Sequence, residues 1–355
     1  MSDVIGASPR PPWCAMLTRL HRAAPDGPLP EVLTNPPPER RRWVDGEDKA
    51  QERAIVRVLD AHFADPDRDP AALARAARGL TFPLHGRKSI SAAARRAGAD
   101  RAHRTGLWLV RHGTAPAEVM AGLTLLVAWL DLSAPLVPRA VPGEADAELV
   151  RVLALDDSCV VAALSVLRGL PDHLLWVAER SRGWERVLAV EEICRSAAGE
   201  LRHWLLRHAC DGDYLNHYFV RKVAERADLE GAMARPDADD ALVDHTGVLL
   251  VFLAESGPSA IVLHDYEPAR RVLAAHAAHL SRQRPTWTRY RRTLLLLRML
   301  LADDAEFPTA TDRAAYAAVL DRDDWRAVAR AGAAAEDAGW WGFETVRALG
   351  LRPVG

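Results

Sequence analysis

The sequence predicts an all-α fold in which antiparallel helix pairs stack into a solenoid, and three observations support this prediction. A five-residue word led by tryptophan occurs twice, as WLVRH from Trp108 and WLLRH from Trp204, and a degenerate copy, WVAER, begins at Trp176. Apolar residues recur with the period of a helix between breaks at Gly, Pro and Asp. We find no convincing alternation of apolar and polar residues over five or more positions, so no sheet is expected.

The spacing of the three words indicates how long one repeat is. The copies begin 68 and then 28 residues apart, which is compatible with helix pairs of about 28 to 48 residues each. A single pair cannot bury its apolar face alone, so neighbouring pairs are expected to stack on one another.

The individual helices follow from the apolar period and from the breaks between them. In chain order they are predicted over residues 47–63, 70–78, 88–97, 101–112, 115–131, 147–155, 158–168, 171–181, 184–195, 199–208, 213–226, 239–255, 267–281, 286–302, 310–320, 323–336 and 342–348. A further short helix is expected around Trp13 to Arg22. Gly113 is expected to end one helix, and Thr114 to be the N-cap of the next.

The first 45 residues differ in composition from the rest of the chain. Residues 1–45 hold nine of the 23 prolines, a density that is incompatible with long helices. We therefore expect a proline-rich N-terminal extension, peripheral to a helical repeat array over residues 46–355. Interruptions near residues 134–146 and 236–240 are candidate points at which the array is subdivided.

Composition excludes several classes of protein. The net charge of −2 gives no general attraction to nucleic acids or membranes, so a charged partner would have to be recognised by a local patch. The four cysteines form no CxxC pair and favour a reducing compartment. No secretory signal is visible, and the longest uncharged apolar run is about eleven residues, whereas a membrane span needs about 18. We expect a cytoplasmic protein with no membrane partner.

Four segments carry a family resemblance, namely WLVRHGTAPAEVMAGLTLL, GWERVLAVEEICR, WLLRHACDGDYLNHYFVRKVA and DDALVDHTGVLL. With the repeat, they resemble the HEAT and armadillo class of α-solenoids, and more narrowly a group of uncharacterised helical-repeat proteins of GC-rich bacteria. The resemblance spans roughly residues 100 to 300. It implies a right-handed α-solenoid of stacked antiparallel, HEAT-like helix pairs, and it brings no catalytic residues.

Most proteins of the HEAT-like class are binding scaffolds, and a few are enzymes. The DNA glycosylases of the class use a basic concave channel, whereas its di-iron hydroxylases use paired His-Glu motifs. The sequence contains no His-Glu dipeptide, which argues against the hydroxylase activity.

The strongest local charge feature is the window from residue 270 to residue 300, which holds eight arginines and no acid. Arg291 and Arg298 are expected to flank an apolar helical face, with Arg289 and Arg292 farther from it. Arginine suits carboxylates and phosphates, so the candidate binding residues are Arg284, Arg289, Arg291, Arg292 and Arg298. The favoured alternative is that these arginines pair with the acids between residues 303 and 324. A second basic window covers residues 87–111.

Two histidines in the same window were considered as metal ligands. His276 and His279 lie three residues apart on a predicted helix, and His264 and Asp265 are close in the sequence. A closed zinc site needs four ligands, however, and the pattern does not specify the third and fourth. A structural role or a place at the rim of a binding surface is favoured, and both remain candidate binding residues. No metal and no cofactor is expected.

The segment from Leu107 to Gly113, LWLVRHG, resembles the strand and RHG opening of histidine phosphatases. The same Arg-His pair recurs as Arg207-His208 with no glycine after it, and the chain offers none of the parallel strands of that fold. We therefore interpret RHG as a helix end, where Arg and His lie near the terminal carbonyls.

The sequence as a whole favours a non-catalytic helical-repeat scaffold that binds another protein. The alternative is a nucleic-acid-binding HEAT-like array, either DNA-glycosylase-like or of another kind, that uses the arginine-rich windows 87–111 and 270–300 to follow phosphates.

Overall fold

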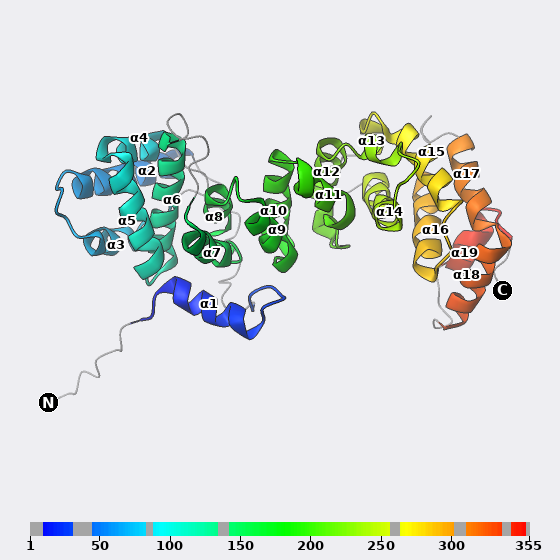
Figure 1. The fold of residues 1–355 in the computed structure, drawn as a ribbon, viewed down its shortest axis with the longest axis horizontal. Coiled ribbons are helices and arrows are strands. Elements are labelled where there is room, and N and C mark those ends of the chain that lie inside the picture. The colour runs from blue at the N-terminus through cyan, green and yellow to red at the C-terminus, as the bar shows by residue number, and fades with distance from the viewer. Residues whose placement is uncertain are drawn as a thin grey trace. The chain divides into compact units, whose positions relative to one another are not determined.

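A computed structural model describes residues 10–30, 45–82, 88–133, 142–255, 263–301, 310–335 and 342–352. Every regular element in these ranges is a helix, as Figure 1 shows, so the all-α prediction is confirmed for them. None of the helices in the same ranges is both long and apolar enough to cross a lipid bilayer.

The chain divides into two compact units, residues 1–193 and 194–355. The boundary falls inside helix α10 (Gly183–Arg195), and not at either of the interruptions considered from the sequence. Of those interruptions, residues 134–141 lie outside the described ranges. The two units are described separately below.

Unit 1 is built from helices that pack on the helix two places further along the chain. Its helices are α1 (Trp13–Ala23), α2 (Asp45–Phe63), α3 (Pro70–Ala77), α4 (Lys88–Ala97), α5 (Ala99–His112), α6 (Pro116–Ser133), α7 (Glu144–Leu153), α8 (Val160–Val166), α9 (Pro171–Arg180) and most of α10. α2 packs on α4, α4 on α6 and α6 on α8, while α7 packs on α9. Adjacent helices also pair, above all α5 with α6.

The pairing of α5 with α6 depends on two glycines. A Cβ atom on Gly122 would lie 2.7 Å from the carbonyl oxygen of Gly106 and 2.9 Å from Cβ of Leu109. No side chain fits at that separation, so the two backbones touch where the helices cross. Gly113 ends α5 as predicted, but α6 begins at Pro116, and the backbone N–H of Thr114 donates to Oε2 of Glu118 at 2.7 Å instead of Thr114 being the N-cap.

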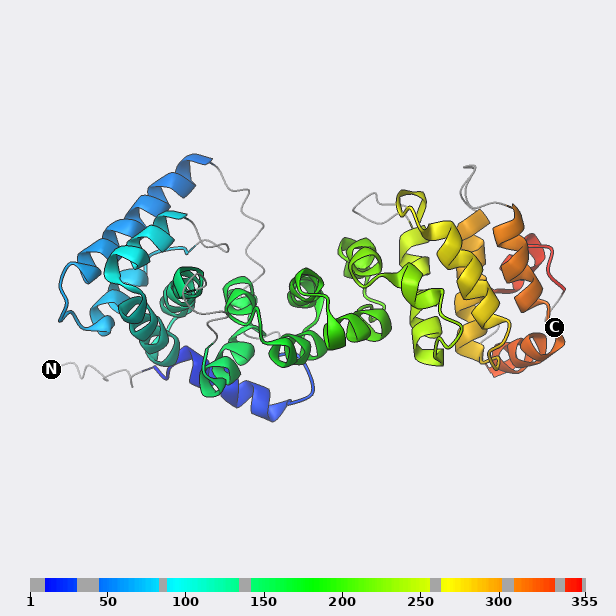
Figure 2. The ribbon, with the colours of Figure 1, turned by 45° about the horizontal axis from the view of Figure 1, so that its top comes forward.

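The N-terminal extension contains a docked helix. α1 packs against α5 and α7, and Figure 2 shows it in dark blue beside the green helices of unit 1. The indole Nε1 of Trp13 donates to Oδ2 of Asp156 at 2.7 Å, its backbone N–H donates to the carbonyl of Gly113 at 2.7 Å, and Leu17 is fully buried. Eleven residues of the extension therefore belong to the packed part of unit 1.

Unit 2 contains two rows of helices. Its elements are α11 (Gly199–His208), the 3-10 helix η2 (Tyr214–Tyr218), α12 (Val220–Arg226), α13 (Leu229–Met233), α14 (Asp240–Ala254), the 3-10 helix η3 (Leu263–Asp265), α15 (Ala269–Leu280), α16 (Trp287–Leu301), α17 (Ala310–Leu320), α18 (Asp323–Ala335) and α19 (Gly342–Ala348). In one row α11, α14, α16 and α18 pack in succession, and in the other α13 packs on α15 and α15 on α17. Contacts of α14 with α15 and of α16 with α17 join the rows.

Most predicted helices are present, and the differences have local causes. The predicted helix 213–226 is divided, because the side chain of Asp213 accepts the N–H of Leu215 and starts the separate helix η2. The short helix α13 was not predicted. It starts where Asp228 adopts a left-handed conformation, φ 51°, and caps the N–H of Gly231 with its carboxylate.

The repeated word has the same structural role in all three copies, since each copy ends a helix. WLVRH ends α5, WVAER ends α9 and WLLRH ends α11. Arg111 pairs with Asp146 in the first turn of α7, and Arg207 Nη2 pairs with Asp239, the N-cap of α14, at 2.7 Å. RHG therefore ends a helix, as expected.

Candidate functional site

Unit 2 contains an open groove of about 950 Å³ among its described residues, which we call the α14 groove. Three stretches of chain line it: the end of α11 with the following loop and η2, one face of α14, and one face of α16. α14 is the central element, because it packs against α11 and η2 as well as against α16. The lining residues used below are Arg207, Tyr214, His217, Ala241, Asp244, Val248, Phe252, Glu255, Trp287, Arg291, Arg292 and Arg298.

The face of α14 that lines the groove has helical spacing. Ala241, Asp244, Val248, Phe252 and Glu255 follow one another three or four residues apart, so they lie on the same side of the helix. From Ala241 to Glu255 this face is about 21 Å long at the helical rise. It places apolar side chains between two carboxylates.

The side of the groove formed by η2 is aromatic. Tyr214 is 59% exposed, which is the largest exposure among the big apolar side chains described. His217 is buried, its Nδ1 lies 2.7 Å from the carbonyl oxygen of Tyr214, and its ring meets Phe252 edge-on. Nε2 of His217 lies 3.4 Å from Oε2 of Glu255, so η2 is held against the end of α14.

The opposite side of the groove is formed by α16. The indole of Trp287 packs against Gly332 of α18. A Cβ atom on Gly332 would lie 2.2 Å from the indole. The guanidinium of Arg291 lies 5.7 Å from the centre of the Trp287 ring, within the range of a cation–π contact. Arg292 and the exposed Arg298 line the groove further along the helix.

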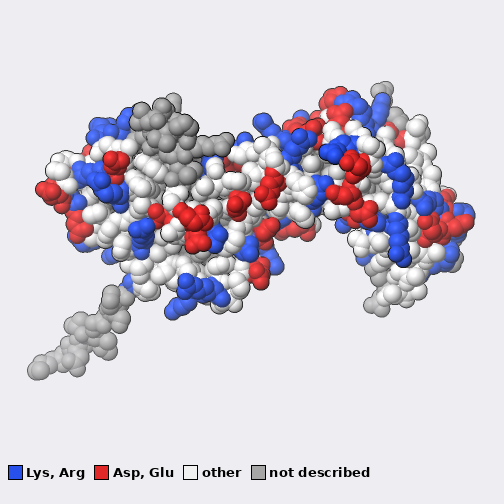
Figure 3. Space-filling view, in the orientation of Figure 1, with Lys and Arg blue, Asp and Glu red and all other residues white. Residues whose placement is uncertain are grey.

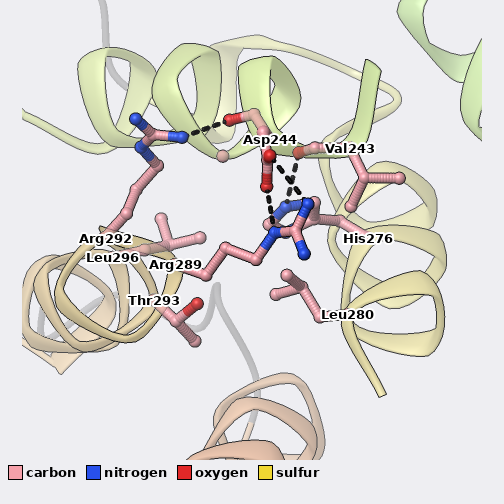
Figure 4. Close-up of a pocket in the computed structure, with 9 residues that line it drawn as sticks. Val243, Asp244, His276, Leu280, Arg289, Arg292, Thr293 and Leu296 are labelled. Carbon is pink, nitrogen blue, oxygen red and sulfur yellow. Dashed lines mark hydrogen bonds and ion pairs between the residues drawn. The ribbon is translucent and has the colours of Figure 1, made fainter. Parts of the chain in front are cut away.

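Arg289 reaches from α16 to Asp244 of α14, as Figure 4 shows. Its Nε and Nη2 donate to the two carboxylate oxygens of Asp244 at 2.7 and 2.9 Å, and Nη2 also lies 2.7 Å from Oδ2 of Asp240. The Arg289 side chain is only 9% exposed. Hydrogen bonding to Asp244 raises the pKa of the guanidinium, and the hydrogen bond from Arg289 lowers the pKa of Asp240.

Arg292 is held differently from Arg289. Its Nη1 donates to the backbone carbonyl of Asp244 at 2.8 Å, and its side chain is half-buried beside Gly247, whose missing Cβ makes room for it. The Asp244 carboxylate is bound by Arg289, and no carboxylate in the described part of unit 2 forms an ion pair with Arg292. Burial lowers the pKa of Arg292, the charge of Asp244 opposes this shift, and the charge of Arg289 adds to it.

The five candidate arginines from the sequence therefore have different positions. Arg291, Arg292 and Arg298 lie together in the α14 groove, whereas Arg284 is exposed and does not line it. Arg289 and Arg292 were both expected to point farther from the apolar face of this helix. The structure places Arg289 buried against α14 by the two acids at the start of that helix, and Arg292 half-buried.

The acids that pair with Arg289 are also different from those expected. Asp240 and Asp244 precede it in the chain, whereas the expected partners follow it. Asp303, Asp304 and Glu306 lie outside the described residues, and Asp321, Asp323 and Asp324 pair with Arg352, Arg326 and Arg322.

The two candidate histidines are structural in this arrangement. His276 is 2% exposed, with Nε2 donating to the carbonyl of Val243 at 3.1 Å and Nδ1 3.0 Å from the Tyr316 hydroxyl. Burial lowers the pKa of His276 to about 3, so the ring is neutral. His279 is also buried and lies 3.0 Å from the carbonyl of Met233. In the described ranges no group of three or more His, Cys, Asp or Glu is placed to hold a metal ion.

His276 borders a narrow cavity beneath the groove, shown in Figure 4. The cavity has a volume of about 10 Å³, which is enough for about one water molecule and too little for an organic ligand. The larger α14 groove is therefore the candidate binding surface of unit 2.

Both basic windows contain arginines that form ion pairs with acidic side chains. In the window 270–300, Arg271 pairs with Glu230 and Glu267, and Arg289 with Asp240 and Asp244. In the window 87–111, Arg96 pairs with Asp60 and Arg111 with Asp146, all in unit 1. Figure 3 shows basic and acidic side chains interspersed on the visible face.

Several groove residues were not found from the sequence. Tyr214, Asp244 and Glu255 are not among the candidate residues that the sequence predicted. The usable signal was the spacing of polar and apolar residues from Ala241 to Glu255, combined with Arg207 in the repeated word.

Comparison of the chain with known protein families, with curated proteins and with solved structures finds no match.

Proposed function

We propose that the protein is a non-catalytic helical-repeat scaffold that binds another protein, and that the α14 groove of unit 2 is a binding surface for it. The observation that carries this proposal is the groove itself. It exposes Tyr214 and apolar positions of α14 and α16 between charged side chains of both signs. Aromatic residues and arginines surrounded by polar groups are typical of protein interfaces.

Two features support a solenoid of stacked helix pairs as the architecture of this scaffold. Unit 2 has two rows of successive helices. In addition, several polar contacts join elements 32 to 45 residues apart. They are Arg78 with Glu118, Arg111 with Asp146, Arg207 with Asp239, Arg271 with Glu230 and Arg289 with Asp244. Contacts limited to neighbouring repeats are characteristic of solenoids. We infer the right-handed, HEAT-like form from the family resemblance.

The charges of the groove favour a protein over a nucleic acid as partner. Asp211, Asp244 and Glu255 line the same depression as the arginines, and carboxylates repel a phosphate backbone. Protein segments carry both signs of charge together with apolar side chains, which matches this surface. We place the protein in the cytoplasm, where its four free, buried cysteines would remain reduced.

Selection from a random peptide library tests the proposal. Peptides of about 16 residues would be selected on the full-length protein and then measured by fluorescence anisotropy. Ala241→Trp fills the groove from an exposed position without changing charge, and Ala334→Trp on exposed α18 surface is its matched control. We expect peptides that bind the wild type and Ala334→Trp but not Ala241→Trp. If every selected peptide binds all three proteins equally, the groove is not the binding surface.

A further inference from the structure

We propose that Arg292 binds a carboxylate of the partner, and that the α14 groove takes an amphipathic helix with acidic and apolar side chains. This inference rests on the proposed function, because it names the chemistry of the partner that the groove would bind. Three observations carry it: the state of the Arg292 charge, the residues around that charge, and the shape of the groove.

The charge of Arg292 is only partly compensated. Among the described residues of unit 2, the Arg292 guanidinium donates one hydrogen bond, from Nη1 to the backbone carbonyl of Asp244. Both carboxylate oxygens of Asp244 accept hydrogen bonds from Arg289. A guanidinium has five N–H donors, so several remain for a ligand. In Figure 4 Arg292 and Arg289 leave α16 in different directions, and the terminal nitrogen of Arg292 that is not bonded to the Asp244 carbonyl points away from Asp244.

The surroundings of Arg292 make an anion more favourable there than at an open surface. The side chain is half-buried, and loss of hydration strengthens an ion pair made at that position. Arg289 lies behind it, and its own charge is offset by Asp240 and Asp244. The fixed backbone contact to Asp244 leaves the guanidinium little freedom to lose on binding.

The shape of the groove favours a helix as the bound segment. Its residues on α14 run for about 21 Å, and those on α16 from Trp287 to Arg298 for about 16 Å. An amphipathic helix of three to four turns matches these lengths, with its apolar stripe on Val248 and Leu295. Carboxylates on the flank of that helix would face Arg292, and basic side chains nearer its end would face Glu255.

A nucleic acid is the competing occupant, and the test must distinguish it. A phosphate could bind Arg292 singly, but a strand following the groove would also approach Asp211 and Glu255. Repulsion by these carboxylates should therefore keep an oligonucleotide out of the groove. An oligonucleotide that binds the protein tightly would have to bind another surface or overcome this repulsion.

The experiment uses the peptides selected for groove-dependent binding by the wild-type full-length chain. We expect acidic residues to be enriched at helical spacing with apolar ones. Replacing each Glu or Asp by Gln or Asn in such a peptide should weaken binding about tenfold, and raising the salt concentration should weaken the acidic peptide but not its amide form. These two measurements need no protein variant.

Protein variants then locate the carboxylate. Arg292→Met should weaken the acidic peptide about tenfold and leave its amide form unchanged, and Arg284→Met, outside the groove, should leave both unchanged. Arg292→Glu should reverse the preference, so that a peptide with Lys in place of Glu binds better than the acidic one. Circular dichroism would confirm that each variant keeps the helical fold.

Each failure has a separate meaning. If no selected peptide loses binding in the Ala241→Trp variant, both the proposed function and this inference are wrong. If the groove-dependent peptides bind with equal affinity in their Glu or Asp form and in their Gln or Asn form, only this inference is wrong. Single-stranded or duplex oligonucleotides that bind more tightly than any peptide, and are lost on Arg292→Met, would make nucleic acid the partner.

Discussion

Arg289 and Asp244 form a two-pronged ion pair, with Nε and Nη2 of the arginine on the two oxygens of one carboxylate. The pair joins α16 to α14, 45 residues earlier in the chain, and Asp240 adds a third contact. Arg289 is thus a structural arginine within the window 270–300, whereas Arg291, Arg292 and Arg298 of the same window line the groove.

Replacing Arg289 by Met should destabilise the protein by about 2 kcal/mol. The change leaves Asp240 and Asp244 without their partner, and the loss is smaller than for a fully buried pair because both acids are partly exposed. Urea unfolding followed by circular dichroism measures it. Arg284→Met is the control, and it should change the free energy of unfolding by less than about 0.5 kcal/mol. Equal effects of the two changes would show that the ion pair contributes nothing.

His276 should make the protein less stable in mild acid. Its pKa falls from an ordinary 6.5 to about 3 because it is buried. The unfolded chain therefore takes up a proton below pH 6.5, whereas the folded chain does not, and stability that is complete above pH 6.5 is lost as the pH falls towards 3. Between pH 7.5 and pH 5 the loss from this group is about 2 kcal/mol.

The variant His276→Gln tests this pH dependence. It should reduce the difference in unfolding free energy between pH 7.5 and pH 5, while His203→Gln, at an exposed position, should keep the wild-type difference. An unchanged difference in His276→Gln would mean that the ring is solvated or charged in the folded protein.

Because α5 and α6 are in close contact at Gly122, we expect Gly122→Ala to lower the free energy of unfolding. Alanine would gain up to about 1 kcal/mol in helix propensity, but its Cβ would lie 2.7 Å from the Gly106 carbonyl oxygen and force the helices apart. We expect a net loss of about 1 to 2 kcal/mol in chemical denaturation. Gly79→Ala, where nothing lies within 4 Å, should be close to neutral. A stabilised Gly122→Ala would show that the helices can separate freely.

Removal of residues 1–27 should weaken unit 1, although proline content alone suggested a dispensable extension. The cut removes the buried Leu17 and the Trp13 bond to Asp156. A loss of about 2 kcal/mol, or roughly 4 to 8 °C in melting temperature, is expected by differential scanning calorimetry. A shorter cut of residues 1–9 is the control, and equal melting temperatures for both truncations would contradict the docking of α1.

The sequence predicted the helices well, because helix formation leaves a periodic pattern within one segment. The predicted helices 199–208 and 310–320 coincide with α11 and α17 at both ends. The sequence did not predict α13, because this helix starts at the left-handed conformation of Asp228.

The candidate site was predictable only in part, because it depends on contacts between segments. Arg291, Arg292 and Arg298 were selected for their density, but nothing in that density indicates that Arg289 turns towards acids 45 and 49 residues earlier. Tyr214 likewise joins the groove only through the packing of η2 on α14.

The docking of α1 has a consequence for the order of folding. The bonds from Trp13 to Asp156 and from Cys14 to the carbonyl of Arg111 close loops of 143 and 97 residues. The contacts of Arg207 with Asp239 and of Arg289 with Asp240 close loops of only 32 and 49 residues. Closing a longer loop costs more entropy, and contacts distant in the chain form slowly. We expect the helices of unit 1 to assemble first and α1 to dock last, which makes it the segment most exposed to proteases on a newly made chain.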